Sequence, residues 1–282
     1  MSRLESIKRL MRSWFSSIPF FVLIGLVLGV LIAISAIPRP NIVIITISGP
    51  ILGQSYADDI LDTLRYARED SSIKAVVLRL NSPGGGASAT EQIYLDLLRL
   101  RQEKAVVASI GTVAASGGYY IAVASNYIYV EPTSQVGSIG AWVSLPQPEK
   151  LEEDVGTSGP FKATGGSRRK FMGYLEMVRQ EFVEAVMLQR GDRLKLSKEE
   201  LSRAEMYLGV EGLKYGLIDD IGTQTAAIEK AASLAGLRNY RVVELPIRSR
   251  LLYWSFGASD LAALKSQTGL IPEYYYLYFE SR

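Results

Sequence analysis

The chain has 282 residues, a formal net charge of +2, and neither histidine nor cysteine. These absences exclude a Ser-His-Asp triad, a cysteine nucleophile, a disulfide bond and a zinc site built from histidine or cysteine. The small net charge gives no field that would attract nucleic acid, and the length suffices for one globular domain with appendages.

The N-terminal part predicts a membrane anchor. Residues 1–17 are basic, and residues 18–37 form an apolar run without any charge. As a helix, such a run is about 30 Å long, which is enough to cross a bilayer. A cleaved signal peptide with a weak cleavage site at 33–35 is the alternative, but the run exceeds the usual apolar region of about 7–15 residues. Because the basic flank stays inside, we predict a single-pass cell-membrane protein with a cytoplasmic N-terminus and the rest of the chain outside.

Strand and helix patterns alternate from residue 41 onward. Apolar runs typical of buried strands cover residues 42–47, 74–80, 105–110, 127–130 and 241–245. Helical patterns cover residues 56–69, 90–103, 119–124, 172–193 and 199–236, the last with a turn at 216–222. The alternation predicts an α/β fold with a parallel sheet and crossover helices. We assign residues 41–250 to this domain and residues 251–282 to an aromatic-rich C-terminal tail, whose composition indicates no function.

A serine lies at one predicted strand-to-helix turn. Ser116 follows the strand at 105–110, and Gly117 and Gly118 separate it from the predicted helix at 119–124. The first N–H groups of a helix are free to bind a ligand, and glycines allow another backbone to approach closely. A plain N-cap in a tight core turn is the alternative. If Ser116 is a nucleophile, the missing histidine leaves a lysine, a carboxylate or the amino terminus as its base, and lysine has precedent.

A second glycine-rich loop follows the neighbouring predicted strand. Residues 81–86 read NSPGGG, and they lack the spacing of phosphate-binding or dinucleotide-binding motifs. Since ligands bind beyond the carboxyl ends of parallel strands, both loops belong at one edge of the sheet, where backbone N–H groups can hold an oxyanion. Ser82 and Ser88 are weaker alternatives for the nucleophile, because Pro83 follows the first and a helix begins at the second.

Four motifs occur in order: NSPGGG at 81–86, GTVAASGGYYIA at 111–122, VGSIG at 136–140 and GPFK at 159–162. Together they resemble the signal peptide peptidase family, peptidase family S49, a class of membrane-bound Ser-Lys proteases. The similarity runs from about residue 41 to residue 236 and follows the short, single-unit form of the family. The resemblance implies a fold like that of caseinolytic protease and crotonase.

The resemblance also implies a role for each matched residue. Ser116 corresponds to the nucleophile, Lys162 to the general base, and Ser138 to a hydroxyl that holds the lysine. Gly84 or Gly85, together with Gly117, corresponds to the oxyanion hole. The family typically has Tyr-Lys where this chain has Phe-Lys, and Lys150 and Lys170 in the same Pro- and Gly-rich stretch remain alternatives for the base. A lysine has a reference pKa of about 10.4, so it must lose water contacts to act as a base near neutral pH.

The function implied by the resemblance is that of a membrane-anchored serine endopeptidase that cleaves apolar, membrane-derived peptides such as spent signal peptides. It needs no metal or other cofactor. Its partners are peptide substrates, the membrane and further copies of the chain, which form a ring with active sites shared between protomers. Alternatives are a protease specific for one membrane protein's apolar segment, a catalytically silent scaffold of the same fold, and acyl-CoA chemistry of the crotonase type.

Overall fold

A computed structural model describes residues 19, 21–30, 40–145, 158–162 and 165–247, and the backbone of residues 274–277. Contacts divide the chain into two units, residues 1–39 and residues 40–282. Residues 21–30 of the first unit are helical. No helix within the described ranges is long and apolar enough to cross a membrane, and residues 31–37 of the predicted span lie outside those ranges. The anchor at 18–37 therefore stays a prediction.

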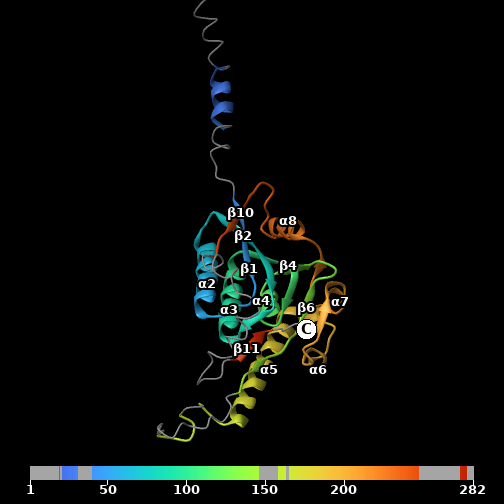
Figure 1. The fold of residues 1–282 in the computed structure, drawn as a ribbon. Coiled ribbons are helices and arrows are strands. Elements are labelled where there is room, and N and C mark those ends of the chain that lie inside the picture. Colours follow the sequence, from blue (N-terminus) through green and yellow to red (C-terminus); the bar gives the residue numbers. More distant parts are fainter. Residues whose placement is uncertain are drawn as a thin grey trace, which may run out of the picture. The chain divides into compact units, whose positions relative to one another are not determined.

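The second unit has mixed α/β architecture (Figure 1). Its strands are β1 (Asn41–Ser48), β2 (Ile73–Ser82), β3 (Gly84–Gly86), β4 (Ala105–Ala115), β5 (Tyr127–Val130), β6 (Gln135–Gly137), β7 (Trp142–Val143), β8 (Met206–Leu208), β9 (Asp220–Ile221), β10 (Arg241–Leu245) and β11 (Tyr274–Leu277). Its helices are α2 (Gln54–Glu69), α3 (Ala87–Glu103), α4 (Gly117–Val123), α5 (Arg168–Arg190), α6 (Lys198–Leu201), α7 (Gly209–Lys214) and α8 (Gln224–Leu234), with a 3-10 turn at Gly191–Arg193.

The main sheet is parallel along its whole central path. Its strand order is β10-β1-β2-β4-β5-β9, and every neighbouring pair in that order runs in the same direction. β6 continues the pairing along the end of β4, and β8 adds to β6 in the antiparallel direction. The predicted parallel sheet with crossover helices is thus confirmed.

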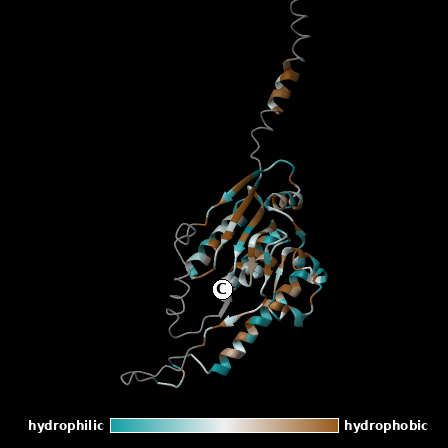
Figure 2. Cartoon of the chain, turned by 45° about the vertical axis from the view of Figure 1, so that its right-hand side comes forward, coloured by the Kyte–Doolittle hydropathy of each residue, from teal (hydrophilic) through white to brown (hydrophobic). Residues whose placement is uncertain are grey.

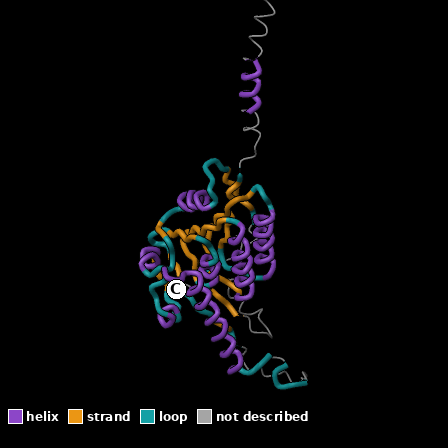
Figure 3. Tube along the Cα trace, turned by 180° about the vertical axis from the view of Figure 1, so that it is seen from behind, coloured by secondary structure: helices purple, strands orange, loops and turns teal. Residues whose placement is uncertain are grey.

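Both faces of this sheet are covered, which explains why its strands read as continuous apolar runs. Val76, Leu78 and Leu80 of β2 belong to a large core with α2, α3, α4 and the C-terminal half of α5. Ala75 and Val77 of the same strand point to the opposite face and pack against α8. Figure 2 shows the apolar strands inside the domain, and Figure 3 shows helices on both sides of them.

The structure corrects two predictions about local structure. Residues 199–236 were predicted to be helical with a turn at 216–222, but strand β8 interrupts the helical part and strand β9 lies within the predicted turn. Each of these strands exists through its pairing with a distant strand, β6 or β5, so local periodicity carries no signal for it. Residues 84–86, predicted as part of a loop, form strand β3, which pairs with β11 in a separate three-stranded sheet of order β3-β11-β7.

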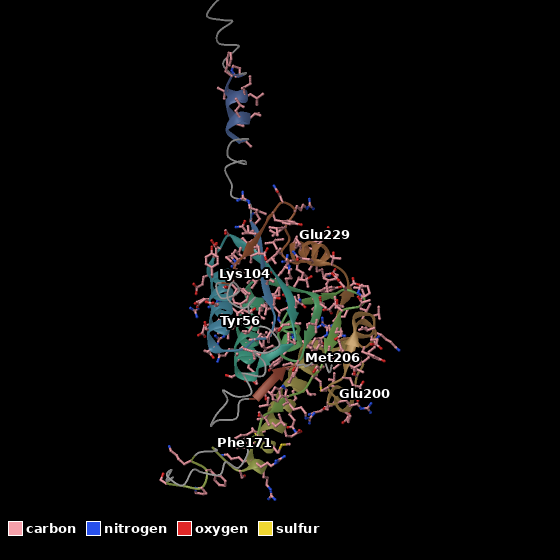
Figure 4. The ribbon with its side chains drawn as sticks, in the orientation of Figure 1. Tyr56, Lys104, Phe171, Glu200, Met206 and Glu229 are labelled. Atoms are coloured by element: carbon pink, nitrogen blue, oxygen red, sulfur yellow. The ribbon has the colours of Figure 1, made fainter. Side chains whose placement is uncertain are left out.

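Helix α5 packs on the main core only through its C-terminal half, although Phe171 near its N-terminal end is also buried. Phe182, Val183 and Val186 in its C-terminal half are buried, whereas Met172 and Met177 in its N-terminal half are 48% and 64% exposed. At 1.5 Å per residue, that exposed half extends about 18 Å from the buried part. Figure 4 places Phe171 at this outer end, well away from Tyr56 and Lys104.

A buried ion pair fixes the C-terminal end of α5. The guanidinium of Arg190 contacts both carboxylate oxygens of Asp219, at 2.9 and 3.0 Å, and its Nε donates to the carbonyl of Gly216 at 2.8 Å. Asp219 also accepts from the backbone N–H of Ile128 at 2.8 Å. The two side chains are 2% and 5% exposed, so neither has water to replace a lost partner.

We expect Arg190→Leu to lower the free energy of unfolding by about 3–5 kcal/mol, because it leaves the Asp219 carboxylate buried without its main partner. Urea unfolding followed by circular dichroism measures the change. Arg179→Leu is the matched control, since Arg179 lies on the same helix but pairs with Glu176 near the surface; its effect should be much smaller. Equal effects of the two substitutions would contradict the role given to the buried pair.

Candidate active site

Ser116 occupies a strained turn between β4 and α4. Its backbone has φ 51° and ψ −121°, a conformation that costs an L-residue of the order of 1–3 kcal/mol. Its N–H donates to the carbonyl of Gly137 at 2.8 Å, and its side chain is buried. Sharp strand-to-helix turns of this kind present a serine at the edge of the sheet in hydrolases. The strain marks Ser116 as a candidate nucleophile rather than an ordinary helix cap.

The VGSIG segment forms one wall beside Ser116. The Ser116 hydroxyl donates to the carbonyl of Gly140 at 3.4 Å, a long bond that leaves it weakly held. Ser138 lies between the two glycines that contact Ser116, at φ 53°, and its N–H donates to the carbonyl of Glu205 at 2.8 Å. The structure therefore brings Ser138 close to Ser116. The carbonyls of Gly137 and Gly140 are site groups that the sequence reasoning missed, although the motif itself was noted.

The end of β2 forms the opposite wall, as predicted from the parallel order. Ser82 is opposite Ala114 in the register, and a β-carbon at Gly118 would lie 2.4 Å from the Ser82 carbonyl oxygen. The Ser82 hydroxyl donates to the carbonyl of Gly49 at 2.7 Å and accepts from the N–H of Gly84 at 3.1 Å. Ser82 thus holds the turn together. Ser88, the other alternative nucleophile, is exposed on α3.

The two candidate oxyanion donors on β3 differ in availability. The N–H of Gly84 already donates to Ser82, whereas the carbonyl of Gly84 accepts from the N–H of Ile51 at 2.8 Å. Because a peptide unit is planar and trans, the N–H of Gly85 points away from Ile51. Gly117 is the first residue of α4, where a helix leaves its N–H groups without acceptors in the helix. Gly84 is therefore the weaker of the two candidates on β3, and the N–H of Gly85 faces β11, where Tyr276 is its partner in the register.

Two tyrosines anchor the helix that follows Ser116. The Tyr119 hydroxyl donates to the carbonyl of Leu217 at 2.7 Å, and burial raises the pKa of Tyr119 above its usual value. Tyr120 stacks on Tyr94 of α3 with ring centroids 4.5 Å apart and contacts Phe182 of α5 at 4.7 Å. Burial also raises the pKa of Tyr120. These neutral, packed side chains hold α4 and thereby the turn at Ser116.

The candidate lysines do not join Ser116 within the described part of this chain. Lys162 is exposed, and its N–H donates to the carbonyl of Gly159 at 3.1 Å. The segment 158–162 lies beyond the outer end of α5, away from α4 (Figure 1). Lys170 places its ammonium 5.5 Å from the ring centre of Tyr174 on the same exposed half of α5. Lys150 lies outside the described residues.

Comparisons with known proteins show which family the chain belongs to. A family model described as peptidase family S49 matches residues 99–238, and a model described as Clp protease matches residues 40–136. The protein slr0021 of Synechocystis is 31% identical over 233 residues, which are 75% of this chain and 82% of that relative. This chain belongs to peptidase family S49. The Clp protease match also confirms the caseinolytic-protease-like fold over the residues that carry both glycine-rich loops.

Two longer relatives match this chain over only one part of their own length. Protease 4 of Haemophilus influenzae is 31% identical over 73% of this chain and 37% of its own length. Serine protease SPPA, chloroplastic, of Arabidopsis thaliana is 30% identical over 77% of this chain and 35% of its own length. The chain therefore spans about a third of these two relatives.

The backbone strain at Ser116 can be tested by measuring stability, without an activity assay. Because only glycine adopts this backbone without cost, Ser116→Gly should be about 1 kcal/mol more stable than Ser116→Ala. At the preceding residue, which lies in an ordinary strand, Ala115→Gly should destabilise the protein instead. Thermal and urea unfolding of the three variants measure both signs. If glycine lowers the free energy of unfolding equally at positions 115 and 116, the backbone at Ser116 is not strained.

Proposed function

We propose that this chain is a membrane-anchored serine endopeptidase with a Ser-Lys dyad, which cleaves apolar peptides derived from membrane segments, such as spent signal peptides. The observation that carries the proposal is the strained Ser116 turn, with Gly117 next to it at the start of α4 and the glycine strand β3 packed against that helix. Backbone N–H groups arranged in advance around a serine are the requirement for stabilising the tetrahedral intermediate of acyl transfer. Membership of peptidase family S49 supports the same reaction.

The proposed reaction follows from these groups. The neutral amine of Lys162 takes the proton of the Ser116 hydroxyl, and the oxygen attacks the peptide carbonyl carbon. The amides of Gly85 and Gly117 hold the resulting oxyanion. Collapse of the intermediate breaks the C–N bond, and the protonated lysine gives its proton to the leaving amine. Water, deprotonated by the same lysine, then attacks the ester carbonyl carbon, the C–O bond to Ser116 breaks, and the lysine returns its proton to the serine oxygen.

We further propose that Lys162 acts on Ser116 of a neighbouring subunit in a homo-oligomeric ring. The outer position of segment 158–162 supports this, because the exposed half of α5 separates it from the core of its own chain. Apolar side chains around this segment are exposed, which favours contact with another copy: Phe161 is 51% and Tyr174 is 41% exposed. Burial at such a contact would remove water from the lysine amine and favour its neutral form.

Membrane attachment through residues 18–37 is part of the proposal. The basic residues at 1–17 place the N-terminus in the cytoplasm and the S49 domain on the other side of the membrane. Such an arrangement holds the domain next to peptides released within the membrane. The proposed substrates share an apolar composition, because they derive from membrane segments.

Ser116→Ala should lower kcat/KM for an internally quenched apolar peptide by about three orders of magnitude or more, since the nucleophile is lost. A serine-reactive phosphonate should label the wild type and not this variant. Ser88→Ala is the matched control, because Ser88 is exposed on α3, and it should keep full activity. Activity that survives Ser116→Ala, with the fold intact by circular dichroism, would place the nucleophile elsewhere.

Subunit sharing predicts complementation between two inactive variants. Ser116→Ala and Lys162→Ala should each be inactive alone, but co-expressed chains should regain activity at interfaces that combine an intact serine with an intact lysine. Peptide hydrolysis by purified mixed oligomers, isolated through a different affinity tag on each variant, measures this. A verified mixed oligomer with no activity would show that the dyad does not form between subunits.

A further inference from the structure

The start of β1 is tied closely to the proposed membrane span. That span ends at residue 37, and β1 begins at Asn41. The connection between them reaches at most about 14 Å when fully extended. The headgroup layer of one leaflet is itself about 5–8 Å thick. If the span crosses the bilayer as proposed, Asn41 therefore lies within about 10 Å of the headgroups.

The start of β1 brings other segments to the same edge of the sheet. β2 and β10 begin beside it, because Asn41 is opposite both Ile73 and Arg241. The N–H of Arg241 donates to the carbonyl of Pro40 at 3.0 Å, and the N–H of Asn41 donates to the carbonyl of Ser72 at 2.8 Å. The last turns of α3 and α8 precede β4 and β10, so they lie at this edge as well (Figure 1). The short connection thus brings a whole edge of the domain close to the bilayer.

The β10 side of this edge is basic and partly apolar. Residues 230–243 contain three cations and no carboxylate. Arg238 and Arg241 are exposed, and within the described ranges neither has an ion-pair partner. Leu234 and Val242, close to them in the sequence, are 48% and 40% exposed. Exposed apolar side chains among cations are typical of surfaces that contact anionic headgroups.

The β2 and β4 side of the edge is closer to neutral. Lys74 and Lys104 precede or begin these strands, and Asp70 and Glu103 accompany them. The Lys104 ammonium donates to the carbonyl of Asp70 at 2.7 Å, and the Asp70 carboxylate accepts from the N–H of Ser72 at 2.8 Å. These two groups are thus engaged within the domain. The excess positive charge of the edge therefore lies at the connection from α8 to β10.

The same edge is at the opposite end of the strands from the candidate active site. β2 runs from Ile73, beside Asn41, to Ser82. At about 3.3 Å per residue, its length is about 30 Å. Ser82 is opposite Ala114, close to the Ser116 turn. A domain that stands on its basic edge therefore holds Ser116 about 30 Å from the headgroups.

We propose that residues 234–242, with the start of β1, form a lipid-binding edge that rests on anionic headgroups and holds the Ser116 turn about 30 Å from the bilayer surface. The proposal rests on the membrane attachment in the proposed function. It narrows the class of substrate, because a peptide that is still embedded in the bilayer does not reach Ser116. Substrates are peptides that have left the membrane, or those whose cleaved bond lies about ten or more residues from their embedded part.

Fluorescent labels on the full-length protein in vesicles test this orientation. The chain lacks cysteine, so one introduced cysteine is labelled selectively. Gln102→Cys and Ser233→Cys place the label on exposed positions in the last turns of α3 and α8, which cover opposite faces of the sheet. Glu199→Cys on α6 is the control at the other end of the domain (Figure 1). With phosphatidylglycerol, phosphatidylcholine and a headgroup-nitroxide lipid, the first two labels should lose most of their fluorescence, and the control label should keep it.

Charge reversal tests the role of the two arginines. Arg238→Glu combined with Arg241→Glu should restore the fluorescence of both edge labels. Raising NaCl from about 0.1 to 1 M should do the same, because the Debye length falls from about 10 Å to about 3 Å. Lys195→Glu combined with Lys198→Glu, the same charge change at exposed residues near α6, should leave the quenching as in the wild type. Circular dichroism verifies that each variant is folded.

Lipid-tethered substrates test the distance to Ser116. An internally quenched peptide is linked to a lipid through about four or about twenty residues, which reach at most about 14 or 70 Å. The wild type should cleave only the peptide on the long linker. The variant with both arginines reversed should also cleave the peptide on the short linker, because its domain is free to tilt. Equal cleavage of both peptides by the wild type would contradict the proposed separation.

Flotation of the protein with vesicles separates this proposal from the proposed function. A chain that does not float refutes the anchor and the lipid-binding edge together. A chain that floats while the labels at positions 102 and 233 stay unquenched refutes the edge alone and leaves the anchor intact. If no free peptide is hydrolysed, the peptidase function fails, and the quenching still decides whether the edge lies on the headgroups.

Discussion

The close approach of α4 to the end of β2 is the constraint on which the site depends. At Gly118 even one additional carbon would meet the Ser82 carbonyl oxygen at 2.4 Å, so the helix begins as near to the neighbouring strand as two backbones allow. The chain must turn sharply between β4 and α4 to achieve this, and Ser116 takes the strained conformation at the turn. Tertiary packing of Tyr119 and Tyr120 compensates for the strain.

Main-chain groups dominate the walls of the site as a result. Carbonyls of Gly137 and Gly140 contact Ser116, Gly117 follows it directly at the start of α4, and the glycine strand β3 lies against that helix. Such groups recognise any extended backbone, because they contact no side chain of the bound peptide. Any preference among peptide sequences would therefore have to come from side chains and not from these backbone groups.

Much of the fold was predictable because its strands are buried on both faces. The run at 42–47 marks β1, and the run at 127–130 coincides with β5, since buried parallel strands are continuously apolar. Short strands escaped prediction for the opposite reason. β8 at Met206–Leu208 is too short for its three residues to show a period, and β3 at Gly84–Gly86 consists of glycine alone, so each forms because a distant strand supplies its hydrogen bonds.

The sequence by itself determined the parallel α/β class, the placement of Ser116 at a strand-to-helix turn and the meeting of its loop with residues 81–86 at one sheet edge. These follow from local periodicity and from the rule that parallel strands end together. Only the tertiary structure decided that the Ser82 side chain holds a turn together and that the N–H of Gly84 donates to it. It also decided that Gly85 lies opposite a residue of β11. Those outcomes depend on which way individual hydrogen-bonding groups point after distant segments come together, and the order of residues along a chain does not encode that direction locally.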